Sequence, residues 1–429
     1  MKKYKKHLKL AFAMLGVGLI SIVTTLLALN LLIGNKKIDR PLTSISSVGS
    51  PSFERTMSQV LEPAILEGNS VQALVNGDQI FPAMLSAIQA AQKTITLETY
   101  IYWSGDIGQQ FAQALEERAR QGVKINILID WYGSEINEGF LEQMRNGGVS
   151  IYRYNPPTWT TLDKVSHRTH RRLLIVDGVV GFIGGAGLSE KWSGDAQGPN
   201  HWRDTHFKIE GPAVGQLQSA FLDNWIQTTG EVPRSEGFLP RLEPRGTSRM
   251  HVFKASPGGG SKSMQLMYLL AISSAQTSID LSAAYFLPDE VALQTLVEAM
   301  KRGVRVRVIM PGPYMDRELV QRSSRAKWGV LLAAGAELYQ YQPTMFHCKV
   351  MVVDGQWASV GSTNFDTRSF SINDEANLNV LDADFSRSLT EIFENDLRSS
   401  KRFTLSEWSE LPWWTKAIDK AVTVLDSQL

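Results

Sequence analysis

The chain has 429 residues, 43% of them hydrophobic, which is enough for two or three domains with buried cores. Its formal net charge of +1 excludes the strongly basic composition that marks many nucleic-acid-binding proteins. The single cysteine, Cys348, excludes an internal disulfide and leaves the redox compartment open.

The N-terminus predicts a membrane anchor. Residues 1–9 form a basic tail with five lysines, and the 24 residues 10–33 contain no charged side chain. This run exceeds the ~20 residues needed to cross a bilayer and the ~7–15 of a signal-peptide core. A cleavable signal with a poor site at Ala28-Leu-Asn30 is the alternative. Because five lysines precede the span and three basic residues follow it, we expect a single-pass protein with a cytoplasmic N-terminus.

Beyond the anchor, strand-like and helix-like patterns alternate. Amphipathic segments at residues 109–121 and 291–302 each lead through glycine to a β-branched run, which is typical of βαβ units. The predicted fold class is therefore α/β. The predicted organisation is a linker over residues 34–67, a first domain over 68–230, a connector rich in Gly, Pro, Arg and Ser over 231–262, and a second domain over 263–429.

The two predicted domains repeat one another. Four sequence blocks recur in the same order, three of them being residues 95–103 with 279–287, 120–130 with 301–310, and 148–156 with 335–343. A long period of this kind indicates duplicated domains rather than a solenoid.

The fourth block carries chemically active side chains. Its first copy reads His170-Arg-Arg-Leu-Leu-Ile-Val-Asp177 and is followed by Gly184-Gly-Ala-Gly187. Its second copy reads His347-Cys-Lys-Val-Met-Val-Val-Asp354 and is followed by Gly361-Ser-Thr-Asn364. An apolar strand would avoid a histidine and a cation at its entrance unless they had partners.

Strand alternation predicts where these side chains point. His347 and Lys349 share one face of their strand, as His170 and Arg172 do in the first copy. An imidazole beside a cation suits an anionic tetrahedral group such as a phosphate. The motif aspartates, Asp177 and Asp354, have the opposite parity, so we expect them to brace the turns that end the strands.

Paired H-x-[KR]-x-x-x-x-D motifs, each followed by G-[SG]-x-[NG], resemble the phospholipase D superfamily. Several further stretches resemble bacterial cardiolipin synthases, namely residues 74–78, 202–212, 361–370 and 373–377. The resemblance extends from residue 68 to the C-terminus. It implies two α/β/α sandwich domains related by a pseudo-twofold axis, with both motifs in one site. Together with the cytoplasmic N-terminus predicted from the lysines, it places the expected catalytic domains on the outer, periplasmic side of a bacterial inner membrane.

The resemblance implies a two-step phosphoryl transfer in which one histidine attacks phosphorus and the other handles the proton. His170 is expected to be the nucleophile and His347 the acid and base. Arg172 and Lys349 would bind the non-bridging oxygens, with further phosphate contacts from Ser362, Asn364, Gly185 and Gly187. Asp204 is expected to orient His170, and Glu375 to orient His347. Neither a metal nor another cofactor is expected.

Two positions depart from the symmetric pattern. Arg172 stands where the other motif has a lysine, and its planar fork is not equivalent to an ammonium. Gly187 lacks the amide that Asn364 offers in the second half. We therefore expect the two halves to bind phosphate unequally.

The expected function is phosphatidyl transfer of cardiolipin synthase type, onto phosphatidylglycerol. The donor headgroup is open, with phosphatidylethanolamine as a candidate, and so is the oligomeric state. Alternatives are a phospholipase D hydrolase, a membrane-anchored phosphodiesterase or nuclease, and a phosphate-binding scaffold without turnover. No nucleic-acid partner is expected, because no basic stripe with interleaved aromatics occurs in the body. The C-terminal tryptophans 408, 413 and 414, near two lysines, predict a segment close to the membrane.

Overall fold

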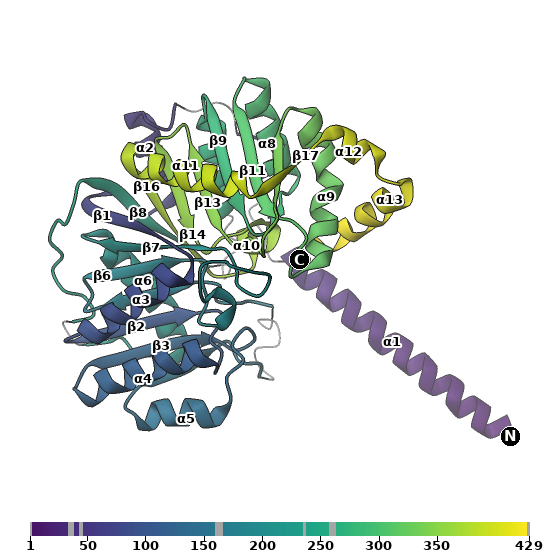
Figure 1. Cartoon of the computed structure of the whole chain (residues 1–429). Coiled ribbons are helices and arrows are strands. Elements are labelled where there is room, and N and C mark those ends of the chain that lie inside the picture. The colour runs from purple at the N-terminus through teal and green to yellow at the C-terminus, as the bar shows by residue number, and fades with distance from the viewer. Residues whose placement is uncertain are drawn as a thin grey trace.

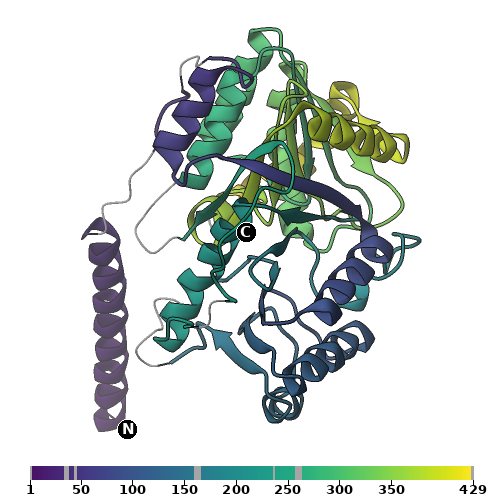
Figure 2. The same cartoon turned by 90° about the vertical axis from the view of Figure 1, so that its left-hand side faces the viewer.

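The computed structural model describes residues 2–32, 38–42, 46–158, 166–234, 237–256 and 263–426. Within them, one mixed 15-stranded sheet runs through the whole body, and helices cover both of its faces (Figure 1, Figure 2). The α/β fold class predicted from the sequence is confirmed.

The two halves of the sheet follow the same strand order outward from the centre, where β1 and β8 pair antiparallel. The order in the first half is β1 (Leu66–Val75), β7 (Thr205–Glu210), β6 (Val180–Gly184), β5 (Leu173–Val176), β2 (Thr94–Thr99), β3 (Lys124–Asp130) and β4 (Ser150–Tyr154). The order in the second half is β8 (Ser248–Ala255), β16 (Glu375–Leu381), β14 (Trp357–Gly361), β13 (Lys349–Val353), β9 (Ser278–Ala283), β11 (Arg305–Pro311) and β12 (Glu337–Tyr341), with β17 (Ser400–Phe403) at the edge. The repeated sequence blocks thus form equivalent strands.

Alternating side chains direct each strand to two helical layers. In β2, Ile95 and Leu97 join the core under α3 (Asn76–Ala90) and α4 (Asp106–Arg120). On the other face, Thr96 donates to Gln218 of α6 (Ala213–Thr229). In the second half, α7 (Ser263–Ser274), α8 (Glu290–Lys301) and α9 (Glu318–Ala333) cover one face and α11 (Ala383–Arg398) the other. A short helix, α5 (Glu138–Asn146), precedes β4.

The motif aspartates hold turns at the strand ends remote from the histidines. The Asp177 carboxylate accepts hydrogen bonds from the backbone N–H groups of residues 92, 93 and 94 at 2.7–2.9 Å. The Asp354 carboxylate accepts from those of residues 276, 277 and 278 at 2.8–2.9 Å. Both aspartates adopt φ of 53° in the turn. Their predicted orientation, away from the histidine face, is what the structure shows.

Two segments differ from their expected character. The expected connector contains β8, because the run Ser248–Ala255 is buried along most of its length and fits the centre of the sheet. The expected linker contains α2 (Pro51–Leu61), whose buried Phe53, Met57 and Leu61 join the core that α7 also lines. Glycine- and proline-rich flanks obscured both elements in the sequence. The domain boundaries themselves stay a prediction.

Helix α1 (Lys2–Leu32) extends away from the body (Figure 1). No helix within the described residues combines the length and apolarity that a membrane crossing requires. The predicted anchor, residues 10–33, reaches residues outside the described ones and stays a prediction.

The C-terminal tryptophans fall into two groups. They lie in α12 (Leu405–Glu410) and α13 (Trp413–Val422), which pack on α9. The Trp408 indole lies against Gly329 and donates to the carbonyl of Arg325, so it belongs to the packing of α9. Trp413 and Trp414 are 75% and 55% exposed. The proposed membrane contact can therefore rest on these two but not on Trp408.

Candidate active site

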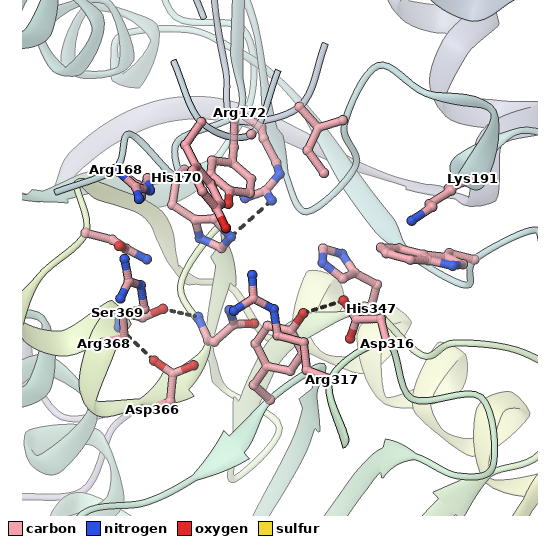
Figure 3. A pocket seen from close by; sticks show the side chains of 18 of the residues that line it. Arg168, His170, Arg172, Lys191, Asp316, Arg317, His347, Asp366, Arg368 and Ser369 are labelled. Carbon is pink, nitrogen blue, oxygen red and sulfur yellow. Dashed lines mark hydrogen bonds between the residues drawn. The ribbon is translucent and has the colours of Figure 1, made fainter. Parts of the chain in front are cut away.

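The two histidine motifs meet in one cavity of about 230 Å3 between the halves of the molecule (Figure 3). His170 lies just before β5 and His347 just before β13, and both rings line the cavity. Equivalent strands begin at this site because the two halves share one strand order around the centre of the sheet. The histidines that lie 177 positions apart in the chain are thereby brought together.

Each histidine contacts a carboxylate from the other half of the chain. Nδ1 of His170 lies 2.9 Å from Oε1 of Glu375, and Nδ1 of His347 lies 2.7 Å from Oδ2 of Asp204. Both carboxylates are fully buried. Asp204 and Glu375 are histidine partners as expected, but the expected pairing of Asp204 with His170 and Glu375 with His347 is wrong.

Crossed backbone pairing explains the exchange. The His170 N–H donates to the carbonyl of Asp374 at 2.9 Å, and the His347 N–H donates to that of Arg203 at 2.8 Å. Each histidine segment therefore runs beside the residue that precedes the other half's carboxylate. Spacing along the sequence suggested that each histidine pairs with the carboxylate of its own half, whereas pairing at the centre of the sheet brings it the carboxylate of the opposite half.

The electrostatic environment keeps both imidazoles neutral. Burial, reinforced by the cations of Arg172 and Lys349, holds the pKa of His170 well below its ordinary range. Burial and the nearby Lys349 ammonium lower the pKa of His347 to about 3. In both rings Nδ1 contacts the carboxylate, so the Nε2 lone pair is the one available for attack on an electrophile.

A buried cation accompanies each histidine. Nη2 of Arg172 lies 3.1 Å from Nε2 of His170, and Nζ of Lys349 lies 3.2 Å from Nε2 of His347. Burial lowers the pKa of Lys349 to about 8 and also lowers that of Arg172. Two desolvated cations beside two Nε2 atoms provide charge for the non-bridging oxygens of a phosphate.

The two carboxylates differ in acidity. Burial raises the pKa of Glu375 to about 7, and the Ser362 hydroxyl donates to it at 2.5 Å. For Asp204, burial acts in the same direction, but His347, Lys349 and the Thr205 N–H outweigh it and lower the pKa. Asp204 is thus a more persistent anion than Glu375. This asymmetry separates the two histidines although their geometry is similar.

Of the expected neutral phosphate contacts, only Asn364 lines the cavity. Ser362 bonds to Glu375 instead. A Cβ on Gly185 would approach the Asp204 carboxylate to 2.6 Å, and one on Gly187 would approach Ile101 to 2.9 Å. The assignment of Ser362, Gly185 and Gly187 to the phosphate is therefore not supported. The Ser362 hydroxyl is bonded to Glu375, and the two glycines allow the close approach of Asp204 and Ile101.

Sequence reasoning missed several residues of the cavity. Additional cations line it, namely Arg168, Lys191, Arg317 and Arg368, together with aromatic rings of Tyr100, Trp103, Trp202 and Tyr285. In Figure 3, Arg168 and Arg368 lie on one side of the histidines and Lys191 on the other. The position of Arg168, two residues before His170, was an available signal. Lys191 carried no motif signal, because tertiary packing alone brings it to the site.

Comparisons with known proteins agree with this geometry. A family described as "Cardiolipin synthase, PLD-like domain" matches residues 84–225 and 268–397. The cardiolipin synthase of Geobacillus kaustophilus is 32% identical over 83% of this chain and 72% of its own length. The major cardiolipin synthase ClsA of Bacillus subtilis is 31% identical over 82% of this chain and 73% of its own.

A solved structure shares the fold. The phosphatidylserine synthase of Haemophilus influenzae superposes with a TM-score of 0.67 at 14% identity, covering 88% of this chain and 99% of its own. At that identity the likeness supports the fold alone.

Proposed function

Because the chain belongs to the cardiolipin synthase family of proteins with phospholipase D-like domains, we propose that it transfers a phosphatidyl group from one phospholipid to the hydroxyl of phosphatidylglycerol. The observation that carries the proposal is the convergence of two neutral, buried histidines, each with its own carboxylate and cation, on one cavity. This arrangement supplies a nucleophile, a proton-transfer group and charge stabilisation for a phosphodiester.

In the first step, Nε2 of His170 attacks phosphorus and forms a P–N bond while the P–O bond to the donor headgroup breaks. His347, which takes up a proton once the anionic phosphate is bound, gives this proton to the departing alkoxide and becomes neutral. His347 suits this role because its partner Asp204 is the more persistent anion and can stabilise the imidazolium. The negative charge of the bound phosphate raises the proton affinity of this ring, which is otherwise low.

In the second step, neutral His347 removes the proton of the acceptor hydroxyl. The new P–O bond forms as the P–N bond to His170 breaks. Arg172 and Asn364, which line the cavity, and Lys349, whose ammonium lies beside His347, stabilise the non-bridging oxygens through both steps. The donor and product are both phosphodiesters, so the transfer requires no nucleotide activation.

The membrane setting is part of the proposal. We propose that residues 10–33 anchor the chain in a bacterial inner membrane, with the two domains and their pseudo-twofold site on the outer side. The exposed Trp413 and Trp414 of α13 support contact with the bilayer surface, with Lys420 of the same helix placed to meet anionic headgroups.

Purified full-length protein in vesicles tests the function. Vesicles of phosphatidylglycerol alone should yield cardiolipin and glycerol by mass spectrometry, and vesicles that also contain phosphatidylethanolamine identify the donor. A single-stranded oligonucleotide belongs in the same panel. Phosphatidic acid as the only product would indicate a hydrolase. Oligonucleotide cleavage without a lipid product would indicate a nuclease and refute the proposal.

A further inference from the structure

Lys191 is a cation in the cavity lining that the two-step chemistry leaves unassigned. It belongs to the short η2 helix (Glu190–Trp192), and its side chain lines the same cavity as the histidines. Its Nζ lies 4.8 Å from the ring centroid of Trp103 and 4.7 Å from that of Trp202. Two indole faces thus hold the ammonium in place.

This ammonium makes no ion pair with any carboxylate in the described part of the chain. Two of the nearby carboxylates have other partners. The Glu190 carboxylate accepts from the Ile107 N–H at 3.0 Å, and the Asp316 carboxylate accepts from the Tyr285 hydroxyl at 2.7 Å. A positioned cation that lines a cavity and has no ion-pair partner is suited to an anion that arrives with the substrate.

The position of Lys191 relative to the histidines indicates which anion. The Trp202 ring that contacts Lys191 also lies 5.2 Å from the ring of His347. Lys191 is therefore on the His347 side of the cavity, as Figure 3 shows. In an in-line displacement with His170 as nucleophile, the leaving group departs, and the acceptor enters, on the His347 side.

We propose that Lys191 binds the phosphate of the acceptor lipid, which is separate from the phosphate that is transferred. Phosphatidylglycerol presents its free hydroxyl and its own phosphodiester at the two ends of a short glycerol linker. With the hydroxyl at His347, this second phosphate lies within reach of the cation beside Trp202. The inference rests on the proposed function and names the residue that selects an anionic alcohol as acceptor.

Water and neutral alcohols lack this second anion. They gain nothing from Lys191, whereas phosphatidylglycerol is held with its hydroxyl directed at the phosphohistidine. Lys191 would accordingly favour transfer over hydrolysis without contacting the reacting phosphorus.

Two reactions of the same full-length protein separate the acceptor from the donor. In vesicles of phosphatidylglycerol, cardiolipin formation requires the lipid acceptor, whereas exchange of the headgroup with added deuterated glycerol uses a neutral one. The variants Lys191→Met and Lys191→Gln remove the charge and Lys191→Arg keeps it. Lys301→Met, at an exposed i,i+3 pair with Glu298 on α8, is the matched control.

Both uncharged variants should form cardiolipin about tenfold to a hundredfold more slowly, the range expected for a lost charge-assisted contact, while glycerol exchange stays within about twofold. Lys191→Arg should recover most cardiolipin formation, and Lys301→Met should match the wild type. Equal loss of both reactions in the two uncharged variants, or no loss of either, would overturn the role of Lys191. A wild-type protein that performs neither reaction would instead overturn the proposed function.

Discussion

Converting the two histidine-bound carboxylates to amides should change the pH dependence of stability for Glu375 but not for Asp204. Burial raises the pKa of Glu375 from 4.5 to about 7. The folded state therefore loses stability as pH rises from about 4.5 through 7, because the unfolded chain ionises this carboxyl in that range while the folded state keeps it neutral. At 1.36 kcal/mol for each pH unit, the change amounts to about 3 kcal/mol.

The variant Glu375→Gln removes this titration. Its free energy of unfolding minus that of the wild type should increase by about 3 kcal/mol between pH 4.5 and pH 8. Taking the difference between variant and wild type cancels other groups that titrate in this window, such as Glu98. Denaturant unfolding of the full-length protein in detergent, followed by tryptophan fluorescence, measures it.

Asp204→Asn is the matched counterpart. The pKa of Asp204 is lowered in the fold, so this carboxylate stabilises the folded state above its ordinary pKa of 3.8 and loses that effect only at more acidic pH. Asp204→Asn should therefore be less stable than the wild type by a constant amount between pH 5 and pH 8. Both variants should lose activity, by about a hundredfold or more, because each leaves one imidazole without its anionic partner. Parallel pH profiles for the two variants would refute the assigned asymmetry.

Three further predictions concern the motifs and the membrane. His170→Ala and His347→Ala should each reduce phosphatidyl transfer to background, and EDTA should leave the wild type active. Residual turnover in either variant, or loss of wild-type activity with EDTA, would contradict the two-histidine mechanism. Asp177→Ala and Asp354→Ala should each lower the free energy of unfolding by about 2 kcal/mol, because each carboxylate accepts hydrogen bonds from three backbone N–H groups. Turnover per folded molecule should not change, since these bonds lie far from the cavity, and lost turnover in a fully folded variant would show a catalytic role. Alkaline phosphatase fused after Leu429 should be active in cells, and an inactive fusion would place the site in the cytoplasm.

The repeat explains how much the sequence could predict. Apolar periodicity and duplicated blocks identified the α/β class, and strand parity correctly directed Asp177 and Asp354 away from His170 and His347. Parity is a local property of a strand, so one sequence suffices to read it. Strand β8 was missed, since its glycine- and proline-rich flanks resemble a connector.

Contacts between the halves were beyond the sequence. The pairing of His170 with Glu375 depends on which strands lie side by side at the centre of the sheet, and spacing along the chain suggested the opposite partner. Lys191 likewise reaches the cavity through packing between Trp103 and Trp202. Ser362 was assigned to phosphate because a hydroxyl after a motif histidine suits that task, but the nearby Glu375 takes its hydrogen bond.

The covalent intermediate tests the central claim most directly. His347→Asn keeps the nucleophile but lacks the group that protonates the leaving headgroup and activates the acceptor. A phosphatidyl adduct should therefore form slowly and then accumulate during long incubation with phosphatidylglycerol vesicles, because it is not passed on. Peptide mass spectrometry should then find one phosphatidyl group on the peptide that contains His170, and none after His170→Ala is added. If the wild type makes cardiolipin but no adduct is found on either motif histidine, the mechanism is contradicted. If an adduct is found only in the His170→Ala protein, on His347, the assignment of the nucleophile is contradicted.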